Sequence, residues 1–437
     1  MYTKSSGADG YMFHLKQGML LGAATAATQI EGGECSHNWN DWYHKGKIKD
    51  GSDPAHTTEH YRLWRADADL ISSMGLKVYR FGVEWSRLCP AEGTIDEAVV
   101  VHYREEMKYL RNKGISLLLT IHHFTNPMWF EKKGGFTKSE NIKYYLELVS
   151  LIVRSFGDIV SEYITINEPN VYAVNSFYLG EWPPAEKSMK QTIAVMSNMA
   201  VCHIEAYKLI HKMRSERGFD DTKVSFANHL RVFEPANRKN PRHVICSRAL
   251  EYLFQGALSK AMYLGRFQFP LKAPWPVNRG EYCDFVAINY YTRSTVFGFS
   301  DGVKKDAPKN DLGWEIYPEG IISCVKKIYS LIKRPVYITE NGTCDNNDSF
   351  RCRYLYDHLK LLSETDLPVE RYYHWCFCDN FEWNEGESAR FGIVHTDYET
   401  EARTVKSSGE FYSAVIRAAG VTTETFDKYV KDQEYHY

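Results

Sequence analysis

The sequence lacks the features that mark several large functional classes. Its 437 residues contain no block of lysine and arginine, and the formal net charge is only -2, so we expect neither nucleic acid nor an anionic membrane as a partner. The first apolar run is short, rich in alanine and followed by Gln29 and Glu31, which fits neither a secretory leader nor a membrane span. These absences predict a cytoplasmic protein that binds a small neutral molecule.

The sequence also lacks the cysteine and histidine patterns that are typical of metal and redox centres. The ten cysteines form no CxxC pair and no zinc-finger spacing, and we expect reduced, mostly buried thiols. Cys376 and Cys378 could form a redox pair on one strand face, but buried thiols are the more common use of cysteine. His122 and His123 would point to opposite faces of a strand and have no evident third ligand, so we expect no metal. No Gly-rich dinucleotide loop follows any predicted strand, and we expect no cofactor.

What the chain does contain is a regular alternation of short apolar strands and amphipathic helices. Hydrophobic residues make up 44% of the sequence, enough for a large core. Strands are expected over residues 19–28, 77–83, 116–121, 163–166, 223–227, 284–288, 336–339 and 372–377. Helices are expected between them, the first capped by Thr57 or Thr58 and the later ones near residues 95–113, 139–156, 189–217, 244–263, 320–333, 349–364 and 407–418.

Eight such units predict an α/β fold, a single (β/α)8 TIM barrel, rather than an open sheet. We assign residues 18–421 to the barrel, residues 1–17 to an N-terminal extension and residues 422–437 to a C-terminal tail. Nearly every predicted strand ends in a polar or aromatic residue. Because the loops at the carboxyl ends of barrel strands carry the active site, we expect these side chains to meet in one bowl.

Two glutamates stand out among the strand ends. Glu340 follows the strand 336–339 and precedes the turn at Asn341 and Gly342, and Glu168 follows the fourth strand. Taken alone, Glu340 could equally be a capping or loop-tip glutamate. Together, paired carboxylates at a barrel mouth suggest glycoside hydrolysis, and their separation, which distinguishes a retaining from an inverting mechanism, cannot be read from the sequence.

The residues around the two glutamates suggest different ionisation states. Arg80 lies within a predicted strand, where an inward guanidinium needs an anion. Arg80 and Tyr291 would keep Glu340 ionised. Glu168 has no evident cation beside it, which suits the raised pKa of a proton donor.

Six motifs resemble those of glycoside hydrolase family 1. They are TINEP at 165–169, ITENG at 338–342, INYYT at 288–292, DNFEW at 379–383, ATQIEG at 27–32 and GWEIYPEG at 313–320. The resemblance extends over about residues 18–419. It implies a retaining exo-β-glycosidase that releases terminal non-reducing residues through a covalent glycosyl-enzyme, most similar to β-glucosidases (EC 3.2.1.21), with galactosides or fucosides as further substrates.

The resemblance also implies roles for individual residues. Glu340 would be the nucleophile and Glu168 the acid, with Arg80 and Tyr291 orienting the nucleophile and Asn167 binding the 2-hydroxyl. The remaining substrate-binding positions are Gln29, His122, His123, Asn289, Trp375, Glu382 and Trp383, of which Trp375 would stack beneath the sugar. His123 departs from the family, which usually has tryptophan there, and this leaves the preferred glycone open.

Two alternative functions remain. A 6-phospho-β-glucosidase would carry serine, lysine and tyrosine where this chain has Glu382, Ala389 and Phe391, so an unphosphorylated sugar is favoured. A non-catalytic carbohydrate-binding protein would usually lack one of the two glutamates. Trp39, Trp42, Trp182 and Trp314 could line the leaving-group side or serve packing, and the sequence does not indicate an oligomeric state.

Overall fold

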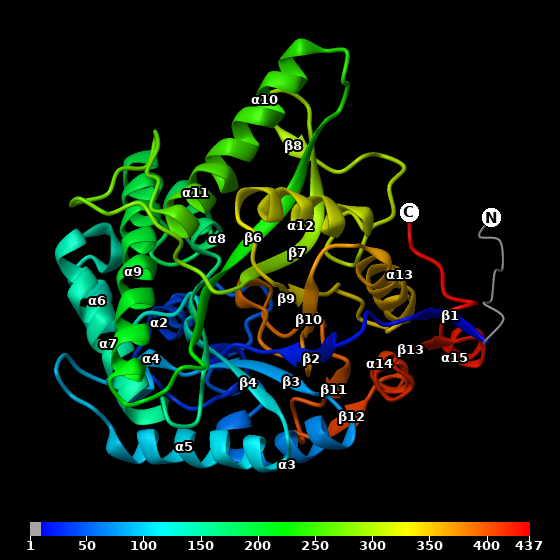
Figure 1. Ribbon diagram of the computed structural model, residues 1–437, viewed down its shortest axis with the longest axis horizontal. Coiled ribbons are helices and arrows are strands. Elements are labelled where there is room, and N and C mark those ends of the chain that lie inside the picture. Colours follow the sequence, from blue (N-terminus) through cyan, green and yellow to red (C-terminus); the bar gives the residue numbers. More distant parts are fainter. Residues whose placement is uncertain (1–9) are drawn as a thin grey trace.

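A closed barrel of eight parallel strands forms the centre of the computed structural model, which describes residues 10–437 (Figure 1). Neighbouring strands pair in parallel throughout, and the pairing of β6 with β7 closes the ring. The strands are β2 (Leu20–Ala24), β3 (Val78–Gly82), β4 (Ser116–His122), β5 (Glu162–Asn167), β6 (Lys223–Pro235), β7 (Val286–Val296), β9 (Val336–Asn341) and β10 (Val369–Trp375). The predicted (β/α)8 barrel is confirmed.

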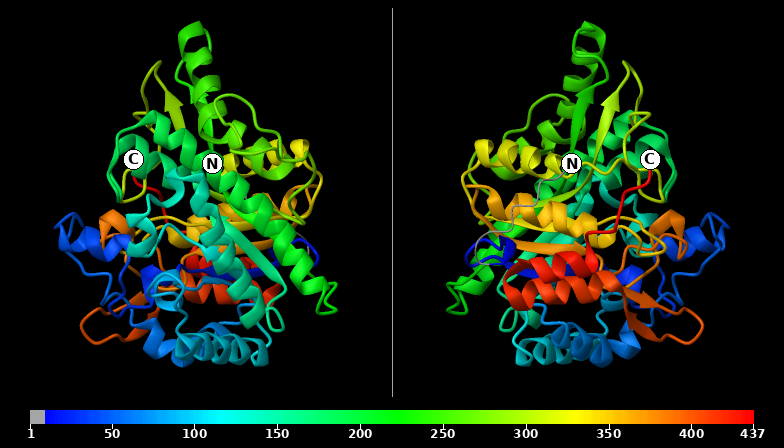
Figure 2. Two further views of the ribbon diagram at one scale, coloured as in Figure 1. Left: turned by 90° about the vertical axis from the view of Figure 1, so that its left-hand side faces the viewer. Right: turned by 90° about the vertical axis from the view of Figure 1, so that its right-hand side faces the viewer.

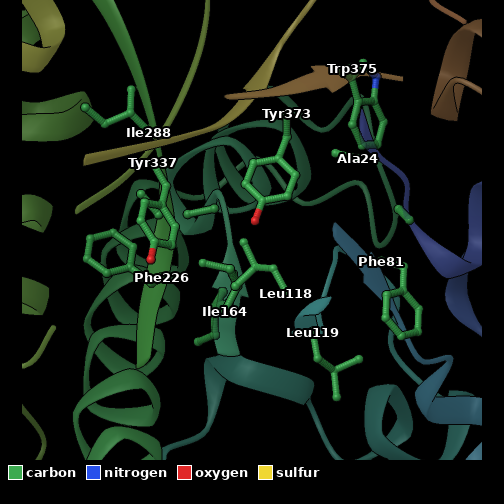
Figure 3. Packing of buried hydrophobic residues seen from close by; sticks show 14 of the residues in the cluster. Ala24, Phe81, Leu118, Leu119, Ile164, Phe226, Ile288, Tyr337, Tyr373 and Trp375 are labelled. Carbon is green, nitrogen blue, oxygen red and sulfur yellow. The ribbon is translucent and has the colours of Figure 1, made fainter. Parts of the chain in front are cut away.

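The strands are buried on both faces, which explains their nearly continuous apolar sequences. Side chains alternate between the barrel interior and the surrounding helices. Figure 3 shows Tyr373, Leu118 and Ile164 turned toward one another, whereas Leu119 and Phe81 point away from them. Since Arg80 precedes Phe81, this alternation directs the arginine into the barrel.

Helices cover the outside of the barrel (Figures 1 and 2). The long ones are α3 (His60–Ser73), α5 (Glu97–Asn112), α7 (Ile142–Phe156), α9 (Met189–Ser215), α10 (Pro241–Glu251), α11 (Ala257–Leu264), α12 (Glu319–Leu331), α13 (Arg351–Glu364) and α14 (Ser407–Ala418). Shorter elements are α1 (Ala27–Ile30), α2 (Asn38–His44), α4 (Trp85–Leu88), α6 (Met128–Lys132), η1 (Gly135–Thr137), η2 (Ser139–Asn141), α8 (Pro169–Ala173), η3 (Val174–Leu179), η4 (Tyr252–Gly256), β8 (Asp301–Gly302), η5 (Trp383–Glu385), β11 (Val394–Thr396) and β12 (Arg403–Val405).

Two barrel strands extend well beyond their predicted ends. β6 continues to Pro235 and β7 to Val296, and the two remain paired as far as Pro235 with Val296. With α10 and β8 they form the projection at the top of Figures 1 and 2. The prediction ended the fifth strand at Ala227 because polar residues begin there. In the structure these residues stay in the strand because its partner continues beside it.

The first predicted unit is wrong in two details. The expected strand 19–28 is β2 followed by the short helix α1, because small residues and a single apolar side chain fit either conformation. Thr57 and Thr58 do not cap α3, whose N-cap position is Glu59. Their hydroxyls instead donate to the backbone carbonyls of Gln29 and Ile30, which holds the short helix α1 that carries Gln29.

The two ends of the described chain meet on the barrel's flank. β1 (Tyr11–His14) pairs antiparallel with β13 (Gly420–Thr422), and α15 (Thr423–Tyr429) follows. Residues 1–9 of the predicted extension lie outside the described residues, and the division into extension, barrel and tail stays a prediction. Over residues 10–437, no helix combines the length and the apolar character needed to cross a bilayer.

Candidate active site

Both predicted glutamates lie buried at the carboxyl ends of barrel strands. Glu340 is the penultimate residue of β9. Each of its carboxyl oxygens accepts a hydrogen bond. Arg80 Nη1 donates to Oε1 at 2.5 Å, and the Tyr291 hydroxyl donates to Oε2 at 2.6 Å. Glu168 directly follows β5, with a left-handed φ of 41° that turns the chain into α8. Two donors therefore orient the Glu340 carboxyl in a fixed plane.

Arg80 is fully buried inside the barrel and has four acceptors, one of them the Thr339 carbonyl at 3.2 Å from Nη1. Besides Glu340, its Nε donates to Thr120 Oγ1 at 3.0 Å and its Nη2 to Asn167 Oδ1 at 2.7 Å. The anion that an inward arginine requires is thus Glu340. The guanidinium also connects Glu340 on β9 to the end of β5.

Amide side chains complete the connection between the two glutamates. Asn289 Nδ2 donates to Asn167 Oδ1 at 3.0 Å and to Glu168 Oε1 at 2.8 Å. The Thr339 hydroxyl donates to Asn289 Oδ1 at 2.7 Å and fixes this amide. Asn167 Oδ1 therefore faces Arg80 and Asn289, and its Nδ2 must point the other way.

A neighbour of Glu168 was missed by the sequence reasoning. His229 Nδ1 lies 3.0 Å from Glu168 Oε1, and Arg231 Nη2 lies 3.3 Å from His229 Nε2. Glu168 therefore has an ionisable imidazole beside it, which the sequence analysis did not anticipate. The signal was present, because His229 stands at the predicted end of the fifth strand like the other site residues.

The pKa values of the two carboxyls are coupled through this network. Burial raises the pKa of Glu340 to about 7, and the charge of Glu168 contributes to the rise. The charge of Arg80 and the hydrogen bond from Tyr291 act in the opposite direction. Burial also raises the pKa of Glu168, but a charged His229, its hydrogen bond and that of Asn289 outweigh burial, and the pKa is lowered. With His229 charged, the order of the two pKa values is the reverse of the predicted one.

A hydrogen-bonded group near Glu340 consists of Gln29, Glu382 and Trp375. Gln29 Nε2 donates to the Phe381 carbonyl at 2.7 Å and to Glu382 Oε2 at 3.2 Å, and Trp375 Nε1 lies 3.4 Å from the same oxygen. Burial raises the pKa of Glu382 to about 8. The Trp375 hydrogen bond lowers this pKa, and the charge of Glu340 raises it further. The structure thus brings these three predicted residues together.

The two histidines after β4 both reach the site. His122 Nε2 lies 2.9 Å from Asn126 Oδ1, whose amide nitrogen donates to the Tyr172 hydroxyl, so His122 Nε2 carries the proton and Nδ1 is an acceptor. His123 Nε2 accepts from Asn167 Nδ2 at 2.9 Å, so its proton is on Nδ1. The His123 ring lies nearly parallel to Trp375 and Trp383, each at 5.8 Å between centroids.

Three of these side chains keep a buried polar atom that has no hydrogen-bond partner within residues 10–437. They are Gln29 Oε1, His122 Nδ1 and His123 Nδ1, that is, two acceptors and one donor. Buried polar atoms are rarely left unpaired unless a ligand or water satisfies them. Hydroxyl groups both donate and accept, so a polyhydroxylated ligand suits this set.

The four tryptophans divide between packing and the rim. Trp39 is buried and packs against Trp383 at 4.8 Å, and Trp42 is also buried. Trp182 is half-buried beside Trp39. Trp314 is 37% exposed and meets the Tyr291 ring edge-on at 5.9 Å between centroids. Of the four, Trp314 is the most exposed.

The remaining predictions concern two phosphate-binding positions, the cysteines and metal ligands. Ala389 and Phe391 are buried, and all ten cysteines are free thiols. Within residues 10–437 no group of three His, Cys, Asp or Glu side chains is arranged to hold a metal ion.

Comparison with known proteins agrees with this geometry. The model of the family described as glycosyl hydrolase family 1 matches residues 12–421. Beta-glucosidase A of Thermotoga maritima is 31% identical over 93% of this chain and 98% of its own length. Among solved structures, a beta-glycosidase from Pyrococcus horikoshii superposes with a TM-score of 0.88 at 32% identity, covering 95% of this chain and 98% of that one. The T. maritima beta-glucosidase in complex with deoxynojirimycin gives 0.84 at 31% identity, with 93% and 99% covered.

Proposed function

The chain belongs to glycosyl hydrolase family 1, and we propose that it is a retaining exo-β-glycosidase that releases terminal, non-reducing β-D-glucosyl residues (EC 3.2.1.21). Galactosyl and fucosyl residues are proposed as secondary substrates. The observation that carries the proposal is the pair of glutamates joined by one network: both oxygens of Glu340 are held by donors, and Arg80, Asn167 and Asn289 connect it to Glu168.

In the first step Glu340 attacks the anomeric carbon as the bond to the leaving oxygen breaks, and Glu168 gives its proton to that oxygen. Arg80 and Tyr291 hold the Glu340 carboxylate with one lone pair directed at the sugar. Attack requires Glu340 to be ionised and Glu168 to be protonated. The donors on Glu340 favour its charged form.

In the second step the ionised Glu168 takes a proton from water, and the water oxygen attacks the anomeric carbon. The bond to Glu340 breaks, the carboxylate is restored and the sugar leaves with the β configuration that it had in the substrate. The same residue therefore acts first as acid and then as base. The mechanism uses no cofactor.

Glycone binding is assigned to the atoms that have no partner. Gln29 Oε1, His122 Nδ1 and His123 Nδ1 would bind hydroxyls, together with Glu382 and Trp383, and Trp375 would cover the apolar face of the ring. Asn167 would bind the 2-hydroxyl with the amide hydrogen that His123 leaves free. Two T. maritima structures hold deoxynojirimycin and glucoimidazole, and we expect the same compounds to bind here.

Neither alternative function is favoured by a specific contact. The three positions at which a phosphoglycosidase would bind its phosphate hold a half-buried carboxyl, Glu382, and two buried uncharged side chains, Ala389 and Phe391. A non-catalytic role leaves the matched donors on both glutamates unexplained. We further propose a cytoplasmic location, which the ten free thiols support and cell fractionation would test.

The proposal is tested with 4-nitrophenyl β-glucoside and azide. Wild type is expected to hydrolyse the glucoside, Glu340→Gly to lose this activity, and azide to restore release of nitrophenol from Glu340→Gly with α-glucosyl azide as product. Azide with Glu168→Ala should give the β-azide instead, because the intermediate is still formed. Glu399→Gly, in an exposed turn, is the matched control and should retain wild-type activity.

Three results would contradict the proposal. Faster hydrolysis of the glucoside 6-phosphate would favour the phosphoglycosidase, and binding of deoxynojirimycin without hydrolysis of any aryl β-glycoside would favour a binding protein. An inverted product from wild type would rule out the covalent intermediate.

A further inference from the structure

We propose that Arg231 holds His229 as the neutral imidazole with its proton on Nδ1, and that His229 in turn keeps the transferable proton on Glu168. Both are positioning residues for the proposed acid, so the inference rests on the proposed function. The contacts that carry it are the 3.0 Å distance from His229 Nδ1 to Glu168 Oε1 and the 3.3 Å distance from Arg231 Nη2 to His229 Nε2.

The contact with Arg231 determines the tautomer of His229. A guanidinium has only donors, so the nitrogen of His229 that faces Arg231 must present a lone pair. Nε2 therefore carries no proton. The single proton of the neutral ring is then on Nδ1, where it is donated to Glu168 Oε1, and a second ring proton would have to sit between Nε2 and a positive charge.

Arg231 is held in place for this contact. Gln255 brackets its backbone, accepting from the Arg231 amide at 3.0 Å and donating to its carbonyl at 3.0 Å. Its Nη1 donates to Ser294 Oγ at 3.3 Å, and the guanidinium carbon lies 5.3 Å from the centroid of the Phe254 ring. Within residues 10–437, no carboxylate forms an ion pair with Arg231. Asp301 and Glu168 attract the guanidinium over a longer range, but neither replaces its contact with His229.

The other groups that face His229 do not supply a second charge. Tyr291 on β7 stacks on the imidazole at 6.1 Å between centroids, and burial keeps the pKa of its hydroxyl well above the usual value, so it stays neutral. Phe254 in η4 meets the ring edge-on at 5.8 Å. Glu168 is the one ionisable group hydrogen-bonded to Nδ1, and Arg231 is the one at Nε2.

The consequence for Glu168 is twofold. A charged His229 is the largest influence that lowers the pKa of this carboxyl, against the raising effect of burial, and a neutral His229 removes its charge while retaining its hydrogen bond. In addition, Oε1 accepts from both His229 and Asn289, which occupies both of its lone pairs. The proton of the acid must then reside on Oε2, the oxygen left to face the leaving group.

Arg231→Met tests the role of the charge. Without the guanidinium, the proton of Glu168 can move to His229, giving a carboxylate beside an imidazolium in contact with it. This transfer changes no proton count, so it lowers the plateau of kcat/KM and moves the basic limb of the pH profile to higher pH. We expect about a tenfold loss with an alkyl β-glucoside, whose leaving group needs the acid, and less than about a twofold loss with the dinitrophenyl glucoside, which leaves unprotonated.

Matched variants separate this role from a structural one. Arg231→Lys retains a donor for Nε2 and should recover most of the activity on the alkyl glucoside. His229→Gln offers a neutral N–H that cannot gain a proton, so adding Arg231→Met to it should cost less than about twofold. Arg238→Met removes an exposed arginine near the end of the same projection. It should leave kcat/KM unchanged for both substrates.

The tautomer itself is read by NMR of the full chain labelled with ¹⁵N-histidine, with His229→Gln identifying the signal. Wild type should show one protonated and one unprotonated nitrogen between pH 6 and 8, and Arg231→Met should show both nitrogens protonated at pH 6. A doubly protonated His229 in wild type at pH 7 would overturn the inference, as would an equal loss on both substrates or an equal loss in the His229→Gln background. The NMR result does not depend on turnover, so failure of the proposed function would leave it readable.

Discussion

Two buried arginine–glutamate pairs lie inside the same barrel, one near each end. Near the amino ends of the strands, Arg371 of β10 binds both oxygens of Glu162, the first residue of β5, with 2.7 Å between Nη2 and Oε1. Near the carboxyl ends, Arg80 binds one oxygen of Glu340. The residue types are the same, but the surroundings of the two pairs differ.

The pair near the amino ends (the lower pair) is surrounded by tyrosines and a second cation. Arg371 Nη1 is 3.3 Å from the Tyr373 hydroxyl, and the guanidinium lies over the Tyr337 ring at 4.6 Å. Glu162 has a second cation, Lys223, at 3.7 Å. The pair near the carboxyl ends (the upper pair) is different, because Arg80 is shared among four acceptors. Within residues 10–437, buried polar atoms of the side chains beside it also have no hydrogen-bond partner. A buried ion pair indicates a site only where such unpaired atoms accompany it.

Removal of the upper arginine should give the largest effect on activity. Arg80→Met takes away a donor that orients the carboxylate of Glu340, the proposed nucleophile, and favours its charged form, so kcat should fall by about 10²- to 10³-fold. The measurement is steady-state hydrolysis of 4-nitrophenyl β-glucoside, with circular dichroism to confirm the fold. Retention of wild-type kcat would show that the two pairs are equivalent.

Removal of the lower arginine should affect stability instead. Arg371→Met leaves Glu162 buried without its bidentate partner and should reduce the free energy of unfolding by about 3 kcal/mol. Activity per folded molecule should stay within about twofold of wild type. Chemical denaturation and active-site titration measure the two quantities, and a loss of kcat without a loss of stability would reverse the comparison.

Acid pH should lower the activity through Glu340 of the upper pair. Because burial raises the pKa of Glu340 to about 7 and only its ionised form attacks, kcat/KM should fall as the pH drops through about 7, approaching tenfold per unit at lower pH. The pH dependence of kcat/KM for an activated aryl glucoside is the measurement. An acid limb lying below about pH 5 would mean that Arg80 outweighs burial.

The smallest of the expected effects concerns His123. His123→Phe keeps a flat ring between Trp375 and Trp383 but removes both the acceptor for Asn167 and the unpaired Nδ1 donor. We expect about a tenfold lower kcat/KM for glucosides. His123→Gln, which can restore a donor and an acceptor, should recover part of the loss, and equal losses in the two variants would point to ring packing.

Much of the site could be predicted because it follows the strand ends. Glu168, Glu340 and His122 each terminate a short apolar run, and a parallel barrel brings all such ends to one face. Arg80 was recognisable as an inward charge in need of a carboxylate. The final helix was predicted with the bounds that the structure gives it, Ser407–Ala418.

What could not be predicted depends on contacts between distant segments. His229 was visible at a strand end, yet its contact with Glu168 depends on the pairing of β5 with β6, and the extension of β6 depends on β7. Arg371 resembles Arg80 in sequence, and only the position of Glu162 across the barrel shows that its role is structural. Local patterns also gave the wrong cap for α3, because the hydroxyls of Thr57 and Thr58 bind backbone carbonyls of α1, 28 positions earlier in the chain.

The central claim is that Glu340, at the upper pair, forms a covalent bond to the sugar. The most direct test is incubation with 2,4-dinitrophenyl 2-deoxy-2-fluoro-β-glucoside, followed by mass spectrometry of the intact protein and of its peptides. The account predicts one fluoroglucosyl group per chain, carried by Glu340, with release of one equivalent of dinitrophenol. Inactivation without an adduct, or an adduct on any other residue, would contradict it.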